Sequence, residues 1–245
     1  MSGRPGRLAR PAHAAVTRSG AELARLIVTV CRVLAHEGLV KGFGHVSARL
    51  PGGGEYVITP KKPLGLVRRG ELLTIAIDNG AVVRGAGQPP LEGVIHTAIY
   101  RARPDVQAIV RAQPPTVEAF GVVGRAVRPA HQFGAVMLGE TPVHRETDPI
   151  ATEEAAAALV ATLGDRTGVI LRGNGVVVTG RTLVEAALRA LNLEESARLE
   201  LMANQLGAPN YYTPDEVKRI GGEILLESQQ GRAWAYWTAR LGRRS

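Results

Sequence analysis

Six histidines and one cysteine are the side chains of this sequence best suited to bind a metal ion or to move a proton. The histidines are His13, His36, His45, His96, His131 and His144. No two of them lie two residues apart, and the lone cysteine excludes a zinc site built from several thiolates. Only Glu92 and His96, four residues apart, could place a carboxylate and an imidazole on one face of a helix. Such a pair is more often a surface or packing pair than a metal site.

Three common catalytic motifs are missing from the sequence. There is no phosphate-binding Gly-Lys-Ser/Thr loop and no Gly-x-Ser-x-Gly turn that could carry a nucleophilic serine. Gly42-Phe43-Gly44 fails the dinucleotide-binding fingerprint, because it precedes a strand-like run instead of joining a strand to a helix. The sequence therefore favours neither a nucleotide-dependent enzyme nor a serine hydrolase.

Composition and charge indicate which partners and which compartment to expect for this protein. The 245 residues are 45% hydrophobic, and the formal charge is +8. Most arginines are scattered among acids and only three residues are Phe, so we expect no specific nucleic-acid partner. No apolar run is long enough to cross a bilayer and no export signal is visible, so the expected compartment is the cytoplasm. Residues 1–20 are predicted to form a flexible basic arm, and residues 21–245 a single domain with a C-terminal helical tail.

Helix and strand patterns alternate along the chain. Helical spacing or capping signals predict helices at 22–38, 91–102, 115–122, 152–164 and 182–206, and from Thr213 onward. Strand-like runs are HVSARL, YVIT, ELLTIAI, AVVRG and VQAIVRAQ, then 133–143 and the strand–turn–strand GVILRGNGVVVTG. This order predicts one α/β domain with a central sheet and helices on its faces.

The order of several motifs resembles the class II aldolase/adducin family from about Glu22 to Glu216. The segments that carry the resemblance are GFGHVSARLP, the Asp78-Asn79-Gly80 hairpin, PLEGVIHTAIYRARPDVQAIV and ILRGNGVVVTGRTLVEA. The Gly-His-Val-Ser and Arg-Pro-Asp-Val stretches look most like the decarboxylase-type branch. The resemblance implies a nine-stranded sheet between helical layers, and a ring-like homotetramer with active sites between subunits. It also implies a divalent metal held by three histidines, with a glutamate that moves protons.

This sequence departs from the family pattern at the metal ligands. The positions of the three histidines hold Arg111, Gln113 and Asn174, whereas the carboxylate is kept as Glu92. A guanidinium stays protonated and an amide coordinates weakly, so we predict that the chain has lost its metal cofactor. The Ser-Ser pair that grips phosphate in the sugar-phosphate aldolases is replaced by Pro90-Leu91. A non-phosphorylated carboxylate or carbonyl substrate is therefore expected.

Three interpretations of these substitutions remain open. In the first, the chain is a metal-independent lyase that breaks a bond beside a carboxylate or carbonyl, with Arg111 stabilising the developing negative charge. Its candidate catalytic residues are Glu92, Arg111 and His131, and its candidate substrate-binding residues are His45, Ser47, Gln113 and Asn174. In the second, the chain is a non-catalytic scaffold, as in adducin, and Arg111 and Glu92 form a structural ion pair. In the third, a metal is held elsewhere, by Glu92 with His96 or His131. Without that role, His96 is expected to pack against the following strand.

Overall fold

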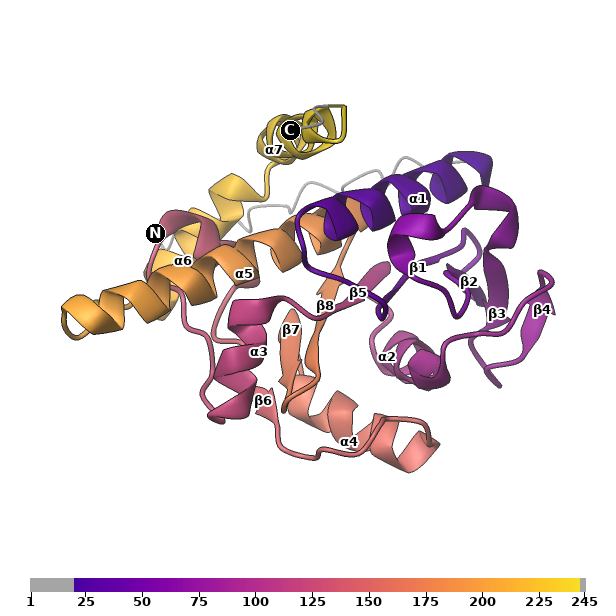
Figure 1. Cartoon of the computed structure of the whole chain (residues 1–245), viewed down its shortest axis with the longest axis horizontal. Coiled ribbons are helices and arrows are strands. Elements are labelled where there is room, and N and C mark those ends of the chain that lie inside the picture. The colour runs from indigo at the N-terminus through magenta and orange to yellow at the C-terminus, as the bar shows by residue number, and fades with distance from the viewer. Residues whose placement is uncertain (1–19, 243–245) are drawn as a thin grey trace, which may run out of the picture.

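The computed structural model describes residues 20–242, whose centre is one eight-stranded sheet in the order β4-β3-β2-β1-β5-β8-β7-β6 (Figure 1). The strands are β1 His45–Arg49, β2 Glu55–Ile58, β3 Leu73–Ala76, β4 Val82–Arg84, β5 Ala108–Ala112, β6 Val143–His144, β7 Gly168–Leu171 and β8 Gly175–Gly180. Neighbouring strands are antiparallel except for the parallel pair β6 and β7. The resemblance implied nine strands, so that count is wrong for the described residues, where Val127 and Thr141 add only an isolated bridge.

Helices cover both faces of the sheet. They are α1 Gly20–His36, α2 Val94–Ala102, α3 Pro115–Val122, α4 Glu153–Leu163, α5 Leu183–Leu206, α6 Pro214–Ile224 and α7 Glu227–Arg240. Four short 3-10 helices are η1 Leu64–Leu66, η2 Arg69–Glu71, η3 Leu91–Gly93 and η4 Gln132–Met137. In Figure 1, α1 and α5 lie above the sheet and α2 and α4 below it. The predicted α/β/α layering is confirmed.

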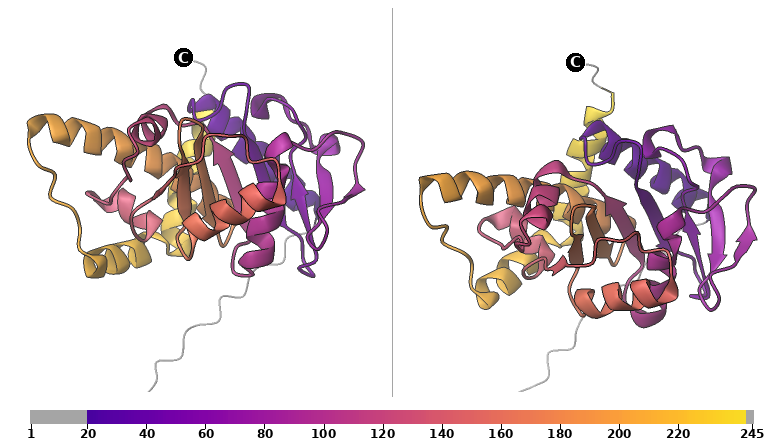
Figure 2. Two further views of the ribbon diagram at one scale, coloured as in Figure 1. Left: turned by 90° about the horizontal axis from the view of Figure 1, so that it is seen from below. Right: turned by 60° about the horizontal axis from the view of Figure 1, so that its bottom comes forward.

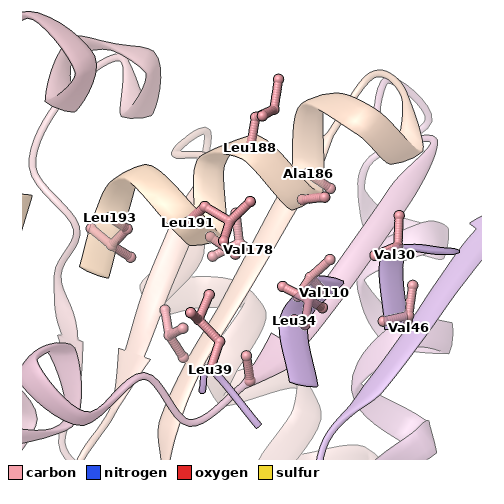
Figure 3. Close-up of a cluster of buried hydrophobic side chains, with 14 of the residues drawn as sticks. Val30, Leu34, Leu39, Val46, Val110, Val178, Ala186, Leu188, Leu191 and Leu193 are labelled. Atoms are coloured by element: carbon pink, nitrogen blue, oxygen red, sulfur yellow. The ribbon is translucent and has the colours of Figure 1, made fainter. Parts of the chain in front are cut away.

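Alternation along the central strands divides the core into two clusters. Val46, Val110 and Val178 point toward α1 and α5, and Figure 3 shows them packed against helix residues such as Leu34 and Leu191. On the opposite face, Ile109 of β5 and Val177 of β8 join a second apolar cluster with residues of α2 and α4. The corresponding residues of β1 are polar, namely His45 and Ser47. The residues that alternate with the valines therefore determine which polar groups lie on the side of the sheet that faces α2 and α4.

Most predicted helices and strands form where they were expected, and threonine caps mark where three of the helices begin. Thr152, Thr182 and Thr213 each accept a backbone hydrogen bond from the third residue after them, which starts α4, α5 and α6. The arm predicted for residues 1–20 lies outside the described residues apart from Gly20. Within residues 20–242, no helix combines the length and apolarity needed to cross a membrane.

The strand predicted for 133–143 is wrong. Residues 132–137 form the 3-10 helix η4, and only residues 143–144 at the end of this region enter the sheet as β6. Side chains satisfy the backbone carbonyls here: Arg189 Nε donates to Val136 O and Thr167 Oγ1 donates to Met137 O. Because these groups are paired, the segment needs no neighbouring strand.

Candidate active site

A buried ion pair joins two elements of the second face. Glu92 lies in η3, directly before α2, and Arg111 lies on β5. Arg111 Nη2 is 2.9 Å from Glu92 Oε2, and the two side chains are only 3% and 12% exposed. Non-helical backbone angles at Glu92 separate η3 from α2, so the helix predicted from residue 91 starts later, at Val94. The change of backbone direction before α2 therefore occurs at the residue whose carboxylate contacts Arg111.

Two amides complete the surroundings of this carboxylate. Asn174, in the turn between β7 and β8, donates from Nδ2 to Glu92 Oε1 at 3.2 Å. Gln113 directly follows β5 and donates from Nε2 to Asn174 Oδ1 at 3.4 Å. The fold therefore brings together four residues that the sequence selected: Glu92, Arg111, Gln113 and Asn174.

The guanidinium of Arg111 is only partly used. Its Nε and Nη1 are buried, and neither has a hydrogen-bond partner among the described residues. Leaving a buried charged donor unpaired is costly, because its hydration is lost without replacement. Two nitrogens of the guanidinium, which together carry three N–H groups, therefore lack an acceptor among the described residues.

A second hydrogen-bonded group extends from the ion pair into the core. His45 Nε2 lies 4.0 Å from Glu92 Oε2, and His45 Nδ1 is 2.5 Å from His96 Nε2. His96 Nδ1 is 2.6 Å from Ser47 Oγ, which is 2.8 Å from Tyr100 Oη. His45 pairs with Arg111 across β1 and β5, so the strand register places the two beside each other. His96 was expected to pack against the following strand, and the structure adds hydrogen bonds from both of its ring nitrogens to His45 and Ser47 on β1, a strand that precedes it.

The electrostatics of the site fix its resting charges. Burial alone would raise the pKa of Glu92, but His45 and the Arg111 charge outweigh it and hold that pKa below its ordinary value. Burial lowers the pKa of His45, and it lowers that of His96 well below its ordinary value. Burial also lowers the pKa of Arg111, against the opposing effect of Glu92, yet a guanidinium remains charged at neutral pH. At neutral pH the site therefore holds one carboxylate, one guanidinium and two neutral imidazoles.

The match to known proteins extends over most of the chain. Residues 25–201 match the family described as Class II Aldolase and Adducin N-terminal domain. The chain belongs to the class II aldolase/adducin family. It is 30% identical to a 3,4-dihydroxyphthalate decarboxylase of Arthrobacter keyseri, over 92% of this chain and 96% of that protein. It is 31% identical to a protein of the same name from a Terrabacter strain, over 89% and 96%. The structure of an L-fuculose 1-phosphate aldolase superposes with a TM-score of 0.78 at 20% identity, covering 86% and 100%, and so supports the fold.

The residues of this class II aldolase/adducin chain do not fit the divalent metal of the family pattern. Within residues 20–242, no group of three His, Cys, Asp or Glu side chains is arranged to hold a metal ion. The carboxylate of Glu92 is instead engaged by the cation of Arg111 and the amide of Asn174. A guanidinium 2.9 Å from the Glu92 carboxylate repels a metal ion that would bind there, and amides are poor ligands for transition metals.

Two sequence candidates lie apart from the ion pair. His131 Nε2 is 2.8 Å from Ser196 Oγ on α5, and no hydrogen bond or ion pair of the described residues links it to Glu92. Ser47 is fully buried and contacts His96 and Tyr100. The catalytic role of His131 and the substrate-binding roles of His45 and Ser47 stay predictions.

The sequence reasoning missed Tyr100 and the contacts of His96. The signal was present as two spacings. His96 and Tyr100 are four residues apart on α2, so they share a helix face. His45 and Ser47 are two residues apart on β1, so they share a strand face. Together these spacings would have predicted a polar contact between α2 and β1.

Proposed function

We propose that this chain is a decarboxylase-type lyase that acts on a non-phosphorylated aromatic or small carboxylate, without a metal ion. The observation that carries the proposal is the buried guanidinium of Arg111, with two nitrogens that have no partner among the described residues, beside an ionised Glu92. The relatives named as 3,4-dihydroxyphthalate decarboxylases support the reaction class. The proposal takes from them the type of bond broken and leaves the individual substrate open.

In the proposed reaction, the bond between the carboxylate carbon and the adjacent substrate carbon breaks and carbon dioxide leaves. Glu92, ionised at rest, accepts the proton of a substrate hydroxyl group and delivers it to the conjugated carbon that bears the carboxylate, so that the hydroxyl oxygen becomes a carbonyl. The electron pair of the bond that then breaks returns through the conjugated system to this oxygen, and Arg111 Nε and Nη1 stabilise the oxyanion that results. One substrate proton thereby replaces the carboxylate, so atoms and charge balance. The amides of Gln113 and Asn174 hold Glu92 and the substrate oxygen in position.

Exposed apolar side chains close in sequence to His45 and Glu92 favour a flat substrate. Phe43 is 75% exposed two residues before His45, and Leu91 is 65% exposed next to Glu92. Pro90, which precedes Leu91, has neither a backbone N–H nor a polar side chain to offer a phosphate. An aromatic ring could pack against such a rim while its oxygens face Arg111.

A non-catalytic scaffold is the second candidate. Arg111 and Glu92 already neutralise each other at 2.9 Å, as a purely structural ion pair would. The two candidates differ in one respect: only a lyase requires Nε and Nη1 of Arg111 to bind a ligand.

A screen followed by matched variants tests the proposal. Hydroxybenzoates, phthalates and small keto acids are screened by thermal shift, with a sugar phosphate as the contrasting compound, because a native-state ligand raises the melting temperature. Compounds that bind are assayed for release of carbon dioxide. Arg111→Ala and Glu92→Gln should each reduce kcat by about a hundredfold to a thousandfold. The matched control is Arg84→Ala, which removes an arginine from an exposed ion pair with Glu55. Two results would favour the scaffold. One is turnover at the wild-type rate in both site variants, and the other is that none of the carboxylates tested is bound and decarboxylated.

A further inference from the structure

Five polar side chains form a continuous line from the interior to the ion pair. In order they are Tyr100, Ser47, His96, His45 and Glu92, each within 2.8 Å of the next except for the last step of 4.0 Å. The first four are at most 4% exposed. The hydrogen bonds among these four buried groups constrain one another, because each link needs one donor and one acceptor.

We propose that His45 and His96 are positioning residues, which hold the Glu92 carboxylate in its reactive orientation through a hydrogen-bond chain that donates in one direction only. The inference rests on the proposed function in one respect, namely that Glu92 moves the proton. The three hydrogen bonds from His45 to Tyr100 do not depend on that function.

The direction follows from the Glu92 end. A carboxylate only accepts hydrogen bonds, so the favourable partner is His45 with its proton on Nε2. A neutral imidazole then has a lone pair on Nδ1, which must accept from His96 Nε2–H. His96 Nδ1 in turn accepts from the Ser47 hydroxyl, and Ser47 accepts from the Tyr100 hydroxyl. In the opposite direction, the lone pair of His45 Nε2 would face the carboxylate and repel it.

The last step, 4.0 Å from His45 Nε2 to Glu92 Oε2, is longer than a hydrogen bond. Catalytic contacts are often long without substrate and shorten when the site closes around it. A turn of either side chain that brings Nε2–H to Oε2 completes the chain. Burial, which lowers the pKa of both histidines, keeps each ring in the neutral form that the direction requires.

The arrangement suits positioning better than proton conduction. The far end, Tyr100 Oη, is buried, and its hydrogen-bond partner among the described residues is Ser47. A proton entering at Glu92 therefore has no exit to solvent along this line. The supports are rigid, because His45 and Ser47 project from β1 and His96 and Tyr100 from successive turns of α2.

The first experiment measures the tautomers directly. Nitrogen-15 correlation spectra of the imidazole rings in the wild-type protein, at about pH 7.5, distinguish a protonated Nε2 from a protonated Nδ1. The expected result is protonated Nε2 in both His45 and His96. A protonated Nδ1 in either ring would overturn the proposal. Since this readout needs no turnover, its failure is separate from failure of the proposed function, which Glu92→Gln and Arg111→Ala decide.

The second experiment compares two amides at position 96. The amide nitrogen of His96→Gln reaches about as far as Nε2 and can still donate to His45, whereas His96→Asn extends only about as far as Nδ1. Removing a partner that orients a functional group typically costs about 10- to 100-fold. We therefore expect His96→Asn to lower kcat by that factor with little change in KM, and His96→Gln to recover most of it. Equal kcat values in the two variants, with equal melting temperatures, would contradict the proposal. If either variant fails to fold, the wild-type tautomers still decide.

Discussion

Glu92 holds Arg111 through one nitrogen only. Nη2 of the guanidinium lies 2.9 Å from Oε2 of the carboxylate, while Nε and Nη1 stay buried without a partner among the described residues. A purely structural pair would gain from a second contact, since bidentate pairing is stronger. One nitrogen of the guanidinium thus stabilises the fold through Glu92, and the two others are the donors that the proposed reaction uses.

Breaking this ion pair on one side should destabilise the fold. Arg111→Met leaves the Glu92 charge in a mostly buried site, which typically costs about 3 to 5 kcal/mol. The double variant Arg111→Met/Glu92→Gln removes both charges and should recover most of that loss. Urea unfolding of the wild type, both single variants and the double variant gives the coupling free energy. A coupling free energy near zero would mean that the pair is solvent-screened.

The buried histidines should make stability depend on pH. The pKa values of His45 and His96 lie below their ordinary value of 6.5, so below that pH the unfolded chain takes up protons that the folded chain does not. The free energy of unfolding should therefore be fully retained above about pH 7 and fall as the pH drops toward about 5. Each histidine contributes a slope of up to about 1.4 kcal/mol per pH unit.

The variant His96→Gln tests whether His96 contributes to this dependence of the unfolding free energy on pH. Urea unfolding at several pH values should give a slope shallower than that of the wild type by up to about 1.4 kcal/mol per pH unit. The pKa of His131 is also lowered by burial, but that residue is present in both proteins and cancels in the comparison. Identical slopes would show that His96 does not resist protonation in the folded state.

Two glycines that flank Asn174 should respond differently to alanine. Gly173 and Gly175 both have positive φ, +68° and +86°, so each substitution carries the left-handed cost of about 1 to 2 kcal/mol. A methyl group at Gly173 meets nothing within 4 Å, whereas one at Gly175 would overlap the carbonyl oxygen of Ala112. Gly175→Ala should therefore cost clearly more than Gly173→Ala and should displace Asn174. Thermal unfolding of the two variants tests this, and equal losses would contradict it.

Histidines at the three substituted positions should create metal affinity. We expect the purified wild-type protein to carry far less than one equivalent of Zn, Mn, Fe or Co, because Arg111 places a cation beside Glu92. The triple variant Arg111→His, Gln113→His and Asn174→His should bind close to one equivalent. Elemental analysis measures both. Stoichiometric metal in the wild type that disappears in Glu92→Ala would instead indicate a relocated metal site.

We propose that the chain assembles as a homotetramer with active sites between subunits. Apolar side chains are exposed along the second half of α5, which projects beyond the sheet in Figure 2; they are Leu199, Leu201, Met202 and Leu206. Light scattering should give about four times the chain mass of 26.0 kDa. Leu201→Glu/Met202→Glu should reduce that mass, whereas Val83→Glu, at an exposed apolar position on β4, should not. A monomer at micromolar concentration would exclude the assembly.

The sequence by itself determined most of the helices and strands and the residue types of the site. Periodicity and caps are local properties, so they predicted α1, α4 and α5, and the glycine-flanked turn that carries Asn174. The substitutions at Arg111, Gln113 and Asn174 were visible because the family motifs keep their spacing. From them alone, a charged site with weak metal ligands could be predicted.

Tertiary structure decided which of these residues meet. The η4 segment has strand-like composition, yet its carbonyls are satisfied by Arg189 and Thr167 from distant elements, and no local pattern reports such partners. His96 likewise has an ordinary position on an apolar helix face. It becomes part of a polar line only because α2 packs on the face of β1 that carries His45 and Ser47. Pairings of this kind depend on strand register and on how helices dock, which are set by packing across the whole chain.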